Sequence, residues 1–270
     1  MKKKLPLHYL ILFVVAIGLL AFTTVNGARA ALTIFSPDYV SDFERYHIGI
    51  TLNEENVKEK RQVGWRNYTI QKDSATSSTG TWVVNEDIPL FSDIPEDGLV
   101  IGKQYSEKYT VTNSGKIDEY VRVKVYKYWA TKNADGTFTK DNSLDPALIV
   151  CALDDTNGWI IDKTETTAER TILYFNKPIT IGEETPAFMT DLTIKADVNN
   201  HDGKPVKETK TGAGGETYTK ITYVYPYDGK QFVVEMEADA VQTHNAVDAI
   251  RSAWGRKVSI DESSKVLTLQ

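Results

Sequence analysis

Hydrophobic and polar residues alternate along much of this chain. The alternation is clearest in four stretches, at 45–52, 118–129, 188–195 and 230–241. In the first stretch, Ile48, Ile50 and Leu52 share one face, opposite Gly49 and Thr51. A period of two indicates β-strands with one face on a core and one face in water. Strands of this kind are typical of antiparallel sheets.

Turn-forming residues separate these strands. Asn, Asp and Gly gather in short loops at 112–116, 133–137, 157–158 and 225–231. Such loops predict β-hairpins, because these residues adopt the backbone angles of tight turns. Two longer stretches, 72–80 and 199–217, are polar and low in complexity. They contain too few hydrophobic residues to order themselves, so we expect mobile hairpin tips there.

One segment near the C-terminus has the spacing of a helix. Val247, Ile250 and Trp254 recur at intervals that place them on one helical stripe. Asn245 is a residue that caps helix starts, and Gly255 is a residue that ends helices. The segment 245–255 therefore predicts one short helix that packs on a sheet through Trp254.

His244 and Asp248 lie at the start of the same segment and suggest a second interpretation, a metal or catalytic pair. An aspartate in the first turn of a helix is favoured by the helix dipole, which accounts for Asp248 without any chemistry. We prefer the structural interpretation of this pair.

Many strands, regular turns and few helices together predict an all-β fold. We expect an antiparallel β-sandwich, jelly-roll-like, with one or a few short helices, one of them near the C-terminus. The chain shows no internal repeat and no break in composition. Residues 31–270 are therefore expected to form a single β-sandwich domain.

The first 30 residues have the three parts of a secretory signal. Three lysines precede an apolar run from Leu10 to Phe22, and small residues follow. The run is shorter than the ~20 residues of a membrane-spanning helix. Signal peptidase is then expected to cleave at Ala28-Arg29-Ala30, with Ala31 as the first mature residue. The alternative is an uncleaved anchor, which would be the chain's only contact with a membrane.

Charge and cysteine content fit an exported protein. Without the four basic residues of 1–30, the net charge falls from −6 to −10. An acidic protein has no electrostatic reason to bind nucleic acid. Cys151 is the only cysteine, so the chain has no internal disulfide, and its apolar neighbours predict a small buried side chain. The protein is expected outside the cell, at the surface or in the matrix.

Motifs for catalysis are missing from the sequence. It has no His-Glu-x-x-His, no Gly-x-Ser-x-Gly and no phosphate-binding loop. The mature histidines, His47, His201 and His244, are far apart in the sequence. Four pairs of adjacent acids lie at strand ends or turns, where we expect solvated side chains: Glu54-Glu55, Asp118-Glu119, Asp154-Asp155 and Glu183-Glu184. We therefore expect no catalytic residues, no metal and no cofactor.

One strand face has the composition of a binding surface. Tyrosines alternate with basic residues on it: Tyr120, Arg122, Lys124, Tyr126 and Tyr128. Such a face could stack on sugars or bind a protein partner. The alternative is that a second layer, or the closing helix, covers it.

Three blocks of the chain resemble a known family. They are "ARAALTIFSPDYV" after the signal, "KYTVTNSGKIDEYVRVKVYKYW" in the middle and "FVVEMEADAVQTHNAVDAIRSAWG" near the end. Together they resemble the SipW-dependent secreted proteins of Gram-positive bacteria, the TasA/camelysin group. The resemblance implies a jelly-roll-like sandwich, export through a dedicated signal peptidase, and fibre assembly in the biofilm matrix. A camelysin-like metalloprotease is a less favoured implication, because the sequence has no recognisable zinc motif.

The mature N-terminus offers a physical route to assembly. Leu32, Ile34 and Phe35 follow the cleavage site and have no nearby hairpin partner. An extended apolar tail can add a strand to an exposed sheet edge of another molecule. We therefore expect residues 31–40 to act as an assembly strand toward a second copy or another matrix protein. The competing function is a carbohydrate- or protein-binding module that uses the tyrosine-rich face.

Overall fold

Two antiparallel sheets dominate the computed structural model of this chain. The structure describes residues 47–55, 59–68, 80–88, 90–91, 94 and 98–270. The signal peptide expected at 1–30 lies outside these residues. No helix in the described part is long and apolar enough to cross a membrane.

The first sheet has six strands. In spatial order they are β3 (Val83–Val84), β2 (Lys60–Tyr68), β1 (Ile48–Glu55), β4 (Gln104–Asn113), β10 (Met189–Ile194) and β7 (Ile149–Leu153). Every pair in it is antiparallel. The order brings together strands far apart in the sequence, since β4 lies between β1 and β10.

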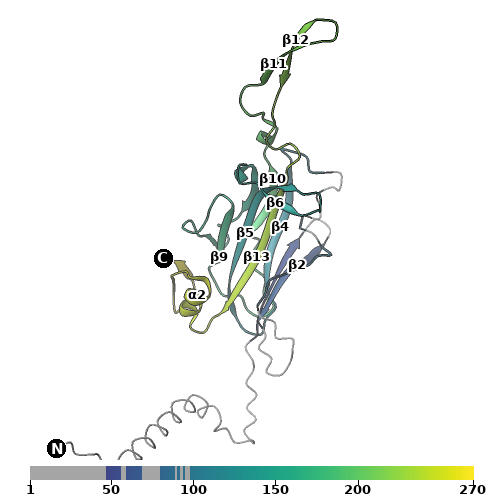
Figure 1. Ribbon diagram of the computed structural model, residues 1–270. Coiled ribbons are helices and arrows are strands. Elements are labelled where there is room, and N and C mark those ends of the chain that lie inside the picture. Colours follow the sequence, from purple (N-terminus) through teal and green to yellow (C-terminus); the bar gives the residue numbers. More distant parts are fainter. Residues whose placement is uncertain (1–46, 56–58, 69–79, 89, 92–93, 95–97) are drawn as a thin grey trace, which may run out of the picture. The chain divides into compact units, whose positions relative to one another are not determined.

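The second sheet is built around the longest strand, β5 (Glu119–Lys132). The other strands are β13 (Gln231–Gln242), β9 (Arg170–Phe175), β8 (Trp159–Ile161) and β6 (Phe138–Lys140). β13 pairs along twelve residues of β5, and β9 pairs on the other side of β5. Figure 1 shows β13 running alongside β5 over its whole length.

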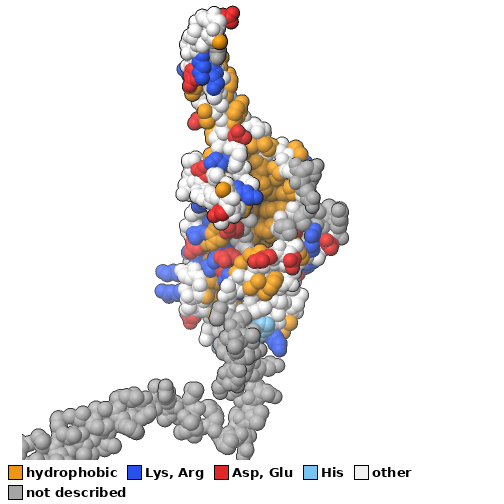
Figure 2. Space-filling model, turned by 45° about the vertical axis from the view of Figure 1, so that its right-hand side comes forward, with side chains coloured by type: hydrophobic (Ala, Val, Ile, Leu, Met, Phe, Trp, Pro, Cys, Tyr) orange, Lys and Arg blue, Asp and Glu red, His pale blue; other side chains and the backbone are white. Residues whose placement is uncertain are grey.

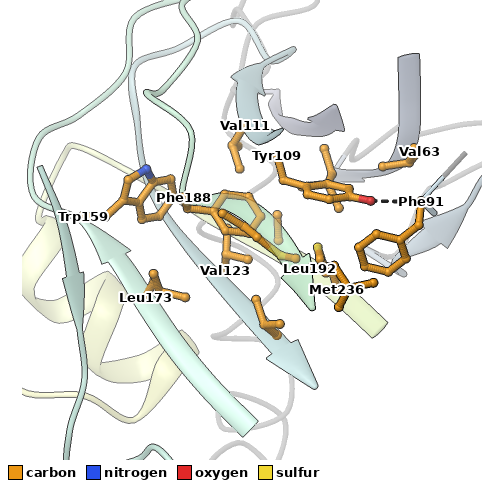
Figure 3. Packing of buried hydrophobic residues seen from close by; sticks show 14 of the residues in the cluster. Val63, Phe91, Tyr109, Val111, Val123, Trp159, Leu173, Phe188, Leu192 and Met236 are labelled. Carbon is orange, nitrogen blue, oxygen red and sulfur yellow. Dashed lines mark hydrogen bonds between the residues drawn. The ribbon is translucent and has the colours of Figure 1, made fainter. Parts of the chain in front are cut away.

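The two sheets pack face to face and enclose the main core. Its buried side chains come from the inner faces of both sheets, as the alternation in the sequence predicted. A row of aromatic rings runs through it: Tyr109 lies 5.7 Å from Phe91 and 6.3 Å from Phe188, which lies 5.5 Å from Trp159, between ring centroids (Figure 3). The prediction of an all-β antiparallel sandwich is confirmed.

A third layer covers one end of the second sheet. It consists of α2 (Ala246–Trp254) and the short hairpin β14 (Val258–Ile260) and β15 (Leu267–Leu269). Ile250 and Trp254 of α2 pack with Tyr120 and Tyr174 in a separate buried cluster. Both faces of β5 are therefore buried at this end.

The helix begins and ends where the sequence predicted, but the residues that it buries are Ala246, Ile250 and Trp254 rather than Val247, Ile250 and Trp254. Gly255 has a φ of 70° and its N–H bonds the carbonyl of Arg251, which ends the helix. Asn245 precedes the helix with a φ of 50° and makes no side-chain capping bond. Val247 is 42% exposed, while Ala246 is buried beside Ile250 and Trp254.

Most of the predictions about hairpin loops are wrong: of the four short loops, only 133–137 closes a hairpin, between β5 and β6. The stretch 199–217 does belong to a hairpin, as expected, but much of it is strand, because β11 (Val206–Thr211) pairs with β12 (Thr217–Thr222) in a two-stranded sheet of its own (Figure 1). The loops at 112–116, 157–158 and 225–231 do not close hairpins. The strands that flank each of them belong to different sheets: β4 and β5, β7 and β8, and β12 and β13. Local turn chemistry indicates that the chain bends there, but it does not indicate which strand pairs next. Two short 3-10 helices, Pro146–Leu148 and Ala196–Asn199, complete the described elements.

Candidate functional site

β13 forms one edge of the second sheet, since among the described strands it pairs only with β5. It lies against β1 and β2 of the opposite sheet. Its inward side chains Phe232, Val234 and Met236 alternate along the strand, and only Met236 is fully buried. The outer backbone edge of β13 therefore pairs with no other described strand, and its inward side chains border the opening between the sheets.

Two hollows lie along this edge. The first has a volume of about 540 Å³ and is lined by Trp129, Tyr227 and Phe232, among others. The second has a volume of about 240 Å³ and is lined by Val63 and Trp82 of the opposite side, together with Val234 and Met236. Figure 2 shows a hollow rich in hydrophobic side chains on the face that it views. Successive inward positions of one strand thus border two apolar hollows.

An ion-pair cluster closes the same opening farther along β13. Arg66 of β2 reaches across from the other sheet to Asp239, and its Nη2 lies 3.3 Å from Oε2 of Glu237. Arg122 and Lys124 of β5 lie 2.8 and 3.2 Å from the Asp239 carboxylate. The cluster ties the two sheets together beyond the second hollow.

Asp239 is 3% exposed and keeps its charge despite this burial. Burial by itself raises the pKa of the carboxyl, but Arg122, Arg66 and Lys124 outweigh it and hold the pKa below its usual value. Sequence reasoning missed Arg66 and Asp239, because they are 173 residues apart. Only opposite charges at aligned positions of β5 and β13 could have suggested part of the cluster.

The predicted tyrosine-rich face is divided by the third layer. Tyr120 is 1% exposed and its hydroxyl donates to the carbonyl of Lys265 at 2.8 Å. Arg122 is 8% exposed, with its guanidinium 5.0 Å from the ring centroid of Trp254. At this end, the closing helix covers the face, so these two side chains are not available to a ligand.

The other end of that face remains half-buried. Lys124, Tyr126 and Tyr128 each keep part of their surface in solvent. The Tyr128 hydroxyl donates to Glu235 at 2.6 Å, and Lys140 lies 5.5 Å from its ring centroid. Burial and Glu235 raise the pKa of Tyr128 to about 12. This ring is already covered by neighbours of its own chain.

Two of the paired acids expected in water are buried. Glu119 is fully buried, and Gly49 donates its backbone N–H to Oε1 at 2.9 Å. Burial raises the pKa of Glu119 to about 8, although the Gly49 bond works against this. Glu54 is 1% exposed and its Oε1 accepts the Tyr109 hydroxyl at 2.9 Å. Both side chains follow the inward direction of their strands, which adjacency in the sequence does not reveal.

The residues first considered for metal or redox chemistry do not form a site of three or more ligands in the described part of the chain. His244 and Asp248 are both exposed on the open C-terminal groove beside α2. Among the described residues, no three of His, Cys, Asp and Glu come close enough to hold a metal ion. Cys151 lies half-buried in β7, where burial raises the pKa of its thiol to about 11.

The residues expected for cleavage, Ala28, Ala30 and Ala31, and those expected for the assembly strand, Leu32, Ile34 and Phe35, lie outside the described residues. The described chain begins at His47, one residue before β1. The candidate site among the described residues is therefore the edge of β13 with its two hollows.

In comparisons with known proteins, no family model, no curated protein and no solved structure matches this chain.

Proposed function

We propose that this chain is an exported, non-enzymatic structural protein of the cell surface or biofilm matrix. It assembles with copies of itself when the N-terminal segment of one copy adds a strand beside β13 of the next. The observation that carries this proposal is the edge of β13, which no other described strand pairs, beside two mainly apolar hollows.

An extended peptide is the ligand that suits the chemistry of this edge. A sheet edge presents backbone N–H and C=O groups that a further strand can pair, and pockets at alternate positions select its side chains. Leu32 and Ile34 are two residues apart, so in a strand they point to the same side. That spacing suits hollows that border alternate residues of β13.

The charges along β13 limit where the added strand lies. Phe232 and Val234 are the first residues of β13 to line the hollows, whereas Glu237, which also lines the second hollow, and Asp239 are engaged by Arg66. The apolar donor fits the first part and would break ion pairs in the second. Because donor and acceptor are different surfaces, repeated contacts do not close on themselves and give a filament.

The direct experiment removes the donor. Mature protein lacking residues 31–40 is expected to fold but to form no fibres in electron microscopy, while the intact mature chain does. Sequencing the N-terminus of the secreted protein checks that cleavage exposes Ala31. Fibres formed by the truncated chain would contradict strand donation.

A matched pair of substitutions tests the acceptor. Val234→Lys puts a charge into the second hollow, and Val233→Lys puts the same charge on the opposite face of β13, across from Tyr128. We expect the first variant to lose assembly and the second to retain it, with both folded by circular dichroism. Equal loss in both variants would argue against the hollow as the acceptor.

A binding module is the second candidate, because Tyr126 is half-buried and also lines the second hollow. Binding on a glycan array that is lost on Tyr126→Ala, with fibre formation unchanged, would favour it over strand donation.

A further inference from the structure

The hairpin of β11 and β12 is not packed on either large sheet. Among the described strands, these two bond only to each other, and every residue of β11 is exposed. The pairing continues toward the sandwich, where the N–H of Asp202 donates to the carbonyl of Val224 at 2.8 Å. We call residues 202–224 the arm. A two-stranded hairpin by itself is only marginally stable in water, so a surface that packs on the arm would stabilise it.

One face of the arm carries no acid. Residues directly opposite each other in a hairpin share a face. The side chains that share this face are Lys207, Thr209, Thr211, Thr217, Thr219 and Ile221. Ile221 is 51% exposed and lies directly across from Lys207. Glu208, the one acid of the two strands, belongs to the other face, where Lys210 lies 3.4 Å from it. We call the acid-free side the Lys207 face.

The C-terminal groove beside α2 has a complementary composition. It has a volume of about 810 Å³. Val247 and Ile260 give it apolar surface, and Val247 is 42% exposed. The charged side chains that line it are three acids and one lysine, all exposed: Asp118, Asp248, Glu262 and Lys265. An apolar side chain next to a lysine therefore suits this groove.

The arm and the groove lie at opposite ends of β5 (Figure 1). Asp118 and Tyr120, at the start of β5, line the groove. At the other end, the chain that leaves the arm is held by Tyr227, whose ring lies 4.8 Å from that of Trp129. From Tyr120 to Trp129 a strand spans about 30 Å. The chain from Ile221 to Tyr227 reaches at most about 20 Å. The Lys207 face therefore does not reach the groove of its own chain.

We propose that the Lys207 face of one copy packs in the C-terminal groove of a second copy. Ile221 then lies against Val247, and Lys207 lies among the acids of the groove. Charge favours a second copy as the occupant, because the arm has four lysines and three acids in a chain of net charge −6. The arm is thus a positive segment on a negative molecule, and opposite charges attract across an interface.

The contact joins two different surfaces of the chain, so it repeats head to tail without closing on itself. It goes beyond strand donation, because it uses neither β13 nor residues 31–40.

Thiol cross-linking tests the contact in the intact mature chain, with Cys151→Ala to remove its own thiol. Thr209→Cys marks the Lys207 face, and Thr243→Cys marks the groove in a second preparation. The two are mixed and oxidised, and a non-reducing gel measures the covalent dimer. The control replaces Thr243→Cys by Thr139→Cys, an exposed position at the other end of β5. We expect about tenfold more dimer with Thr243→Cys than with Thr139→Cys. Equal yields would overturn the proposal.

A charge exchange tests the electrostatic part of the contact. Glu262→Lys in the groove preparation should lower the yield of dimer, because it places a lysine opposite Lys207. Lys207→Glu in the arm preparation should then restore the yield. A yield that neither substitution changes would contradict the pairing of Lys207 with the groove. Circular dichroism of each variant establishes that it is folded.

The same mixtures separate this contact from strand donation. The dimer should also form when both preparations lack residues 31–40. Cross-linking without fibres would support the arm contact and count against strand donation. Fibres without cross-linking above the Thr139→Cys control would leave strand donation in place and overturn the arm contact.

Discussion

Two buried carboxylates of this sandwich have opposite electrostatic surroundings. Asp239 lies among Arg66, Arg122 and Lys124, whereas the carboxylate of Glu119 accepts a hydrogen bond from the backbone N–H of Gly49. Asp239 therefore stays ionised and Glu119 is largely protonated at neutral pH. Burial raises the pKa of both groups, and the neighbouring cations decide which of them keeps a charge.

The two carboxylates also have different structural roles in the sandwich. The Asp239 cluster joins two sheets through charges, beside the edge proposed as the acceptor. Glu119 lies at the start of β5 against the start of β1, where Gly115 and Gly49 allow the backbones to approach. A Cβ on Gly115 would come within 2.3 Å of Oε1 of Glu119, so this position requires glycine.

Asp239→Asn is the largest expected perturbation. It leaves Arg66, Arg122 and Lys124 without their shared carboxylate, and breaking a buried ion pair in this way costs about 4 kcal/mol. Urea denaturation at pH 7 measures the loss.

The same group also predicts a pH dependence. Its folded-state pKa is below the ordinary 3.8, so its contribution is present above that value and is lost as the pH falls through the folded-state pKa. The control for Asp239→Asn is Glu235→Gln, at an exposed position of the same strand. It should change the free energy of unfolding by less than about 0.5 kcal/mol. Equal effects of Asp239→Asn and Glu235→Gln would show that the ion-pair cluster around Asp239 does not contribute to stability.

Glu119→Gln should stabilise the protein, whereas Asp239→Asn should destabilise it. The ordinary pKa of 4.5 applies to the unfolded chain and about 8 to the folded one, so the unfolded chain loses its proton first as the pH rises. Stability is then full below pH 4.5 and falls up to about pH 8. The substitution should stabilise the protein by roughly 3 kcal/mol at pH 9 and change little at pH 4. Denaturation at both pH values measures this, and an identical effect at both would contradict it.

Arg122→Lys sharpens the comparison with a smaller change. Lysine keeps the positive charge beside Asp239, but it loses the planar group that lies over Trp254 and bonds the carboxylate through Nε at 2.8 Å. We expect a loss of about 1 kcal/mol in urea denaturation. A loss as large as that of Asp239→Asn would mean that stacking on the third layer, rather than charge, dominates the cluster.

The candidate site was only partly visible in the sequence. Alternation located β13 and its inward residues Phe232, Val234 and Met236. The hollows beside them depend on Val63 and Trp82, which no local pattern connects to β13. The tyrosine-rich face shows the same limit, since its period correctly grouped Tyr120 with Tyr128 but did not reveal that α2 covers only one of them.

The sequence by itself located strands β1, β5, β10 and β13 and the C-terminal helix, because period-two alternation, helical spacing and glycine act within a few residues. The tertiary structure alone decided that β13 pairs with β5 and that β7 ends a sheet. It also decided that Glu119 is neutral while Asp239 is charged. Periodicity reports which side chains share a face. What covers that face, and which charges meet there, depends on residues more than a hundred positions away along the chain.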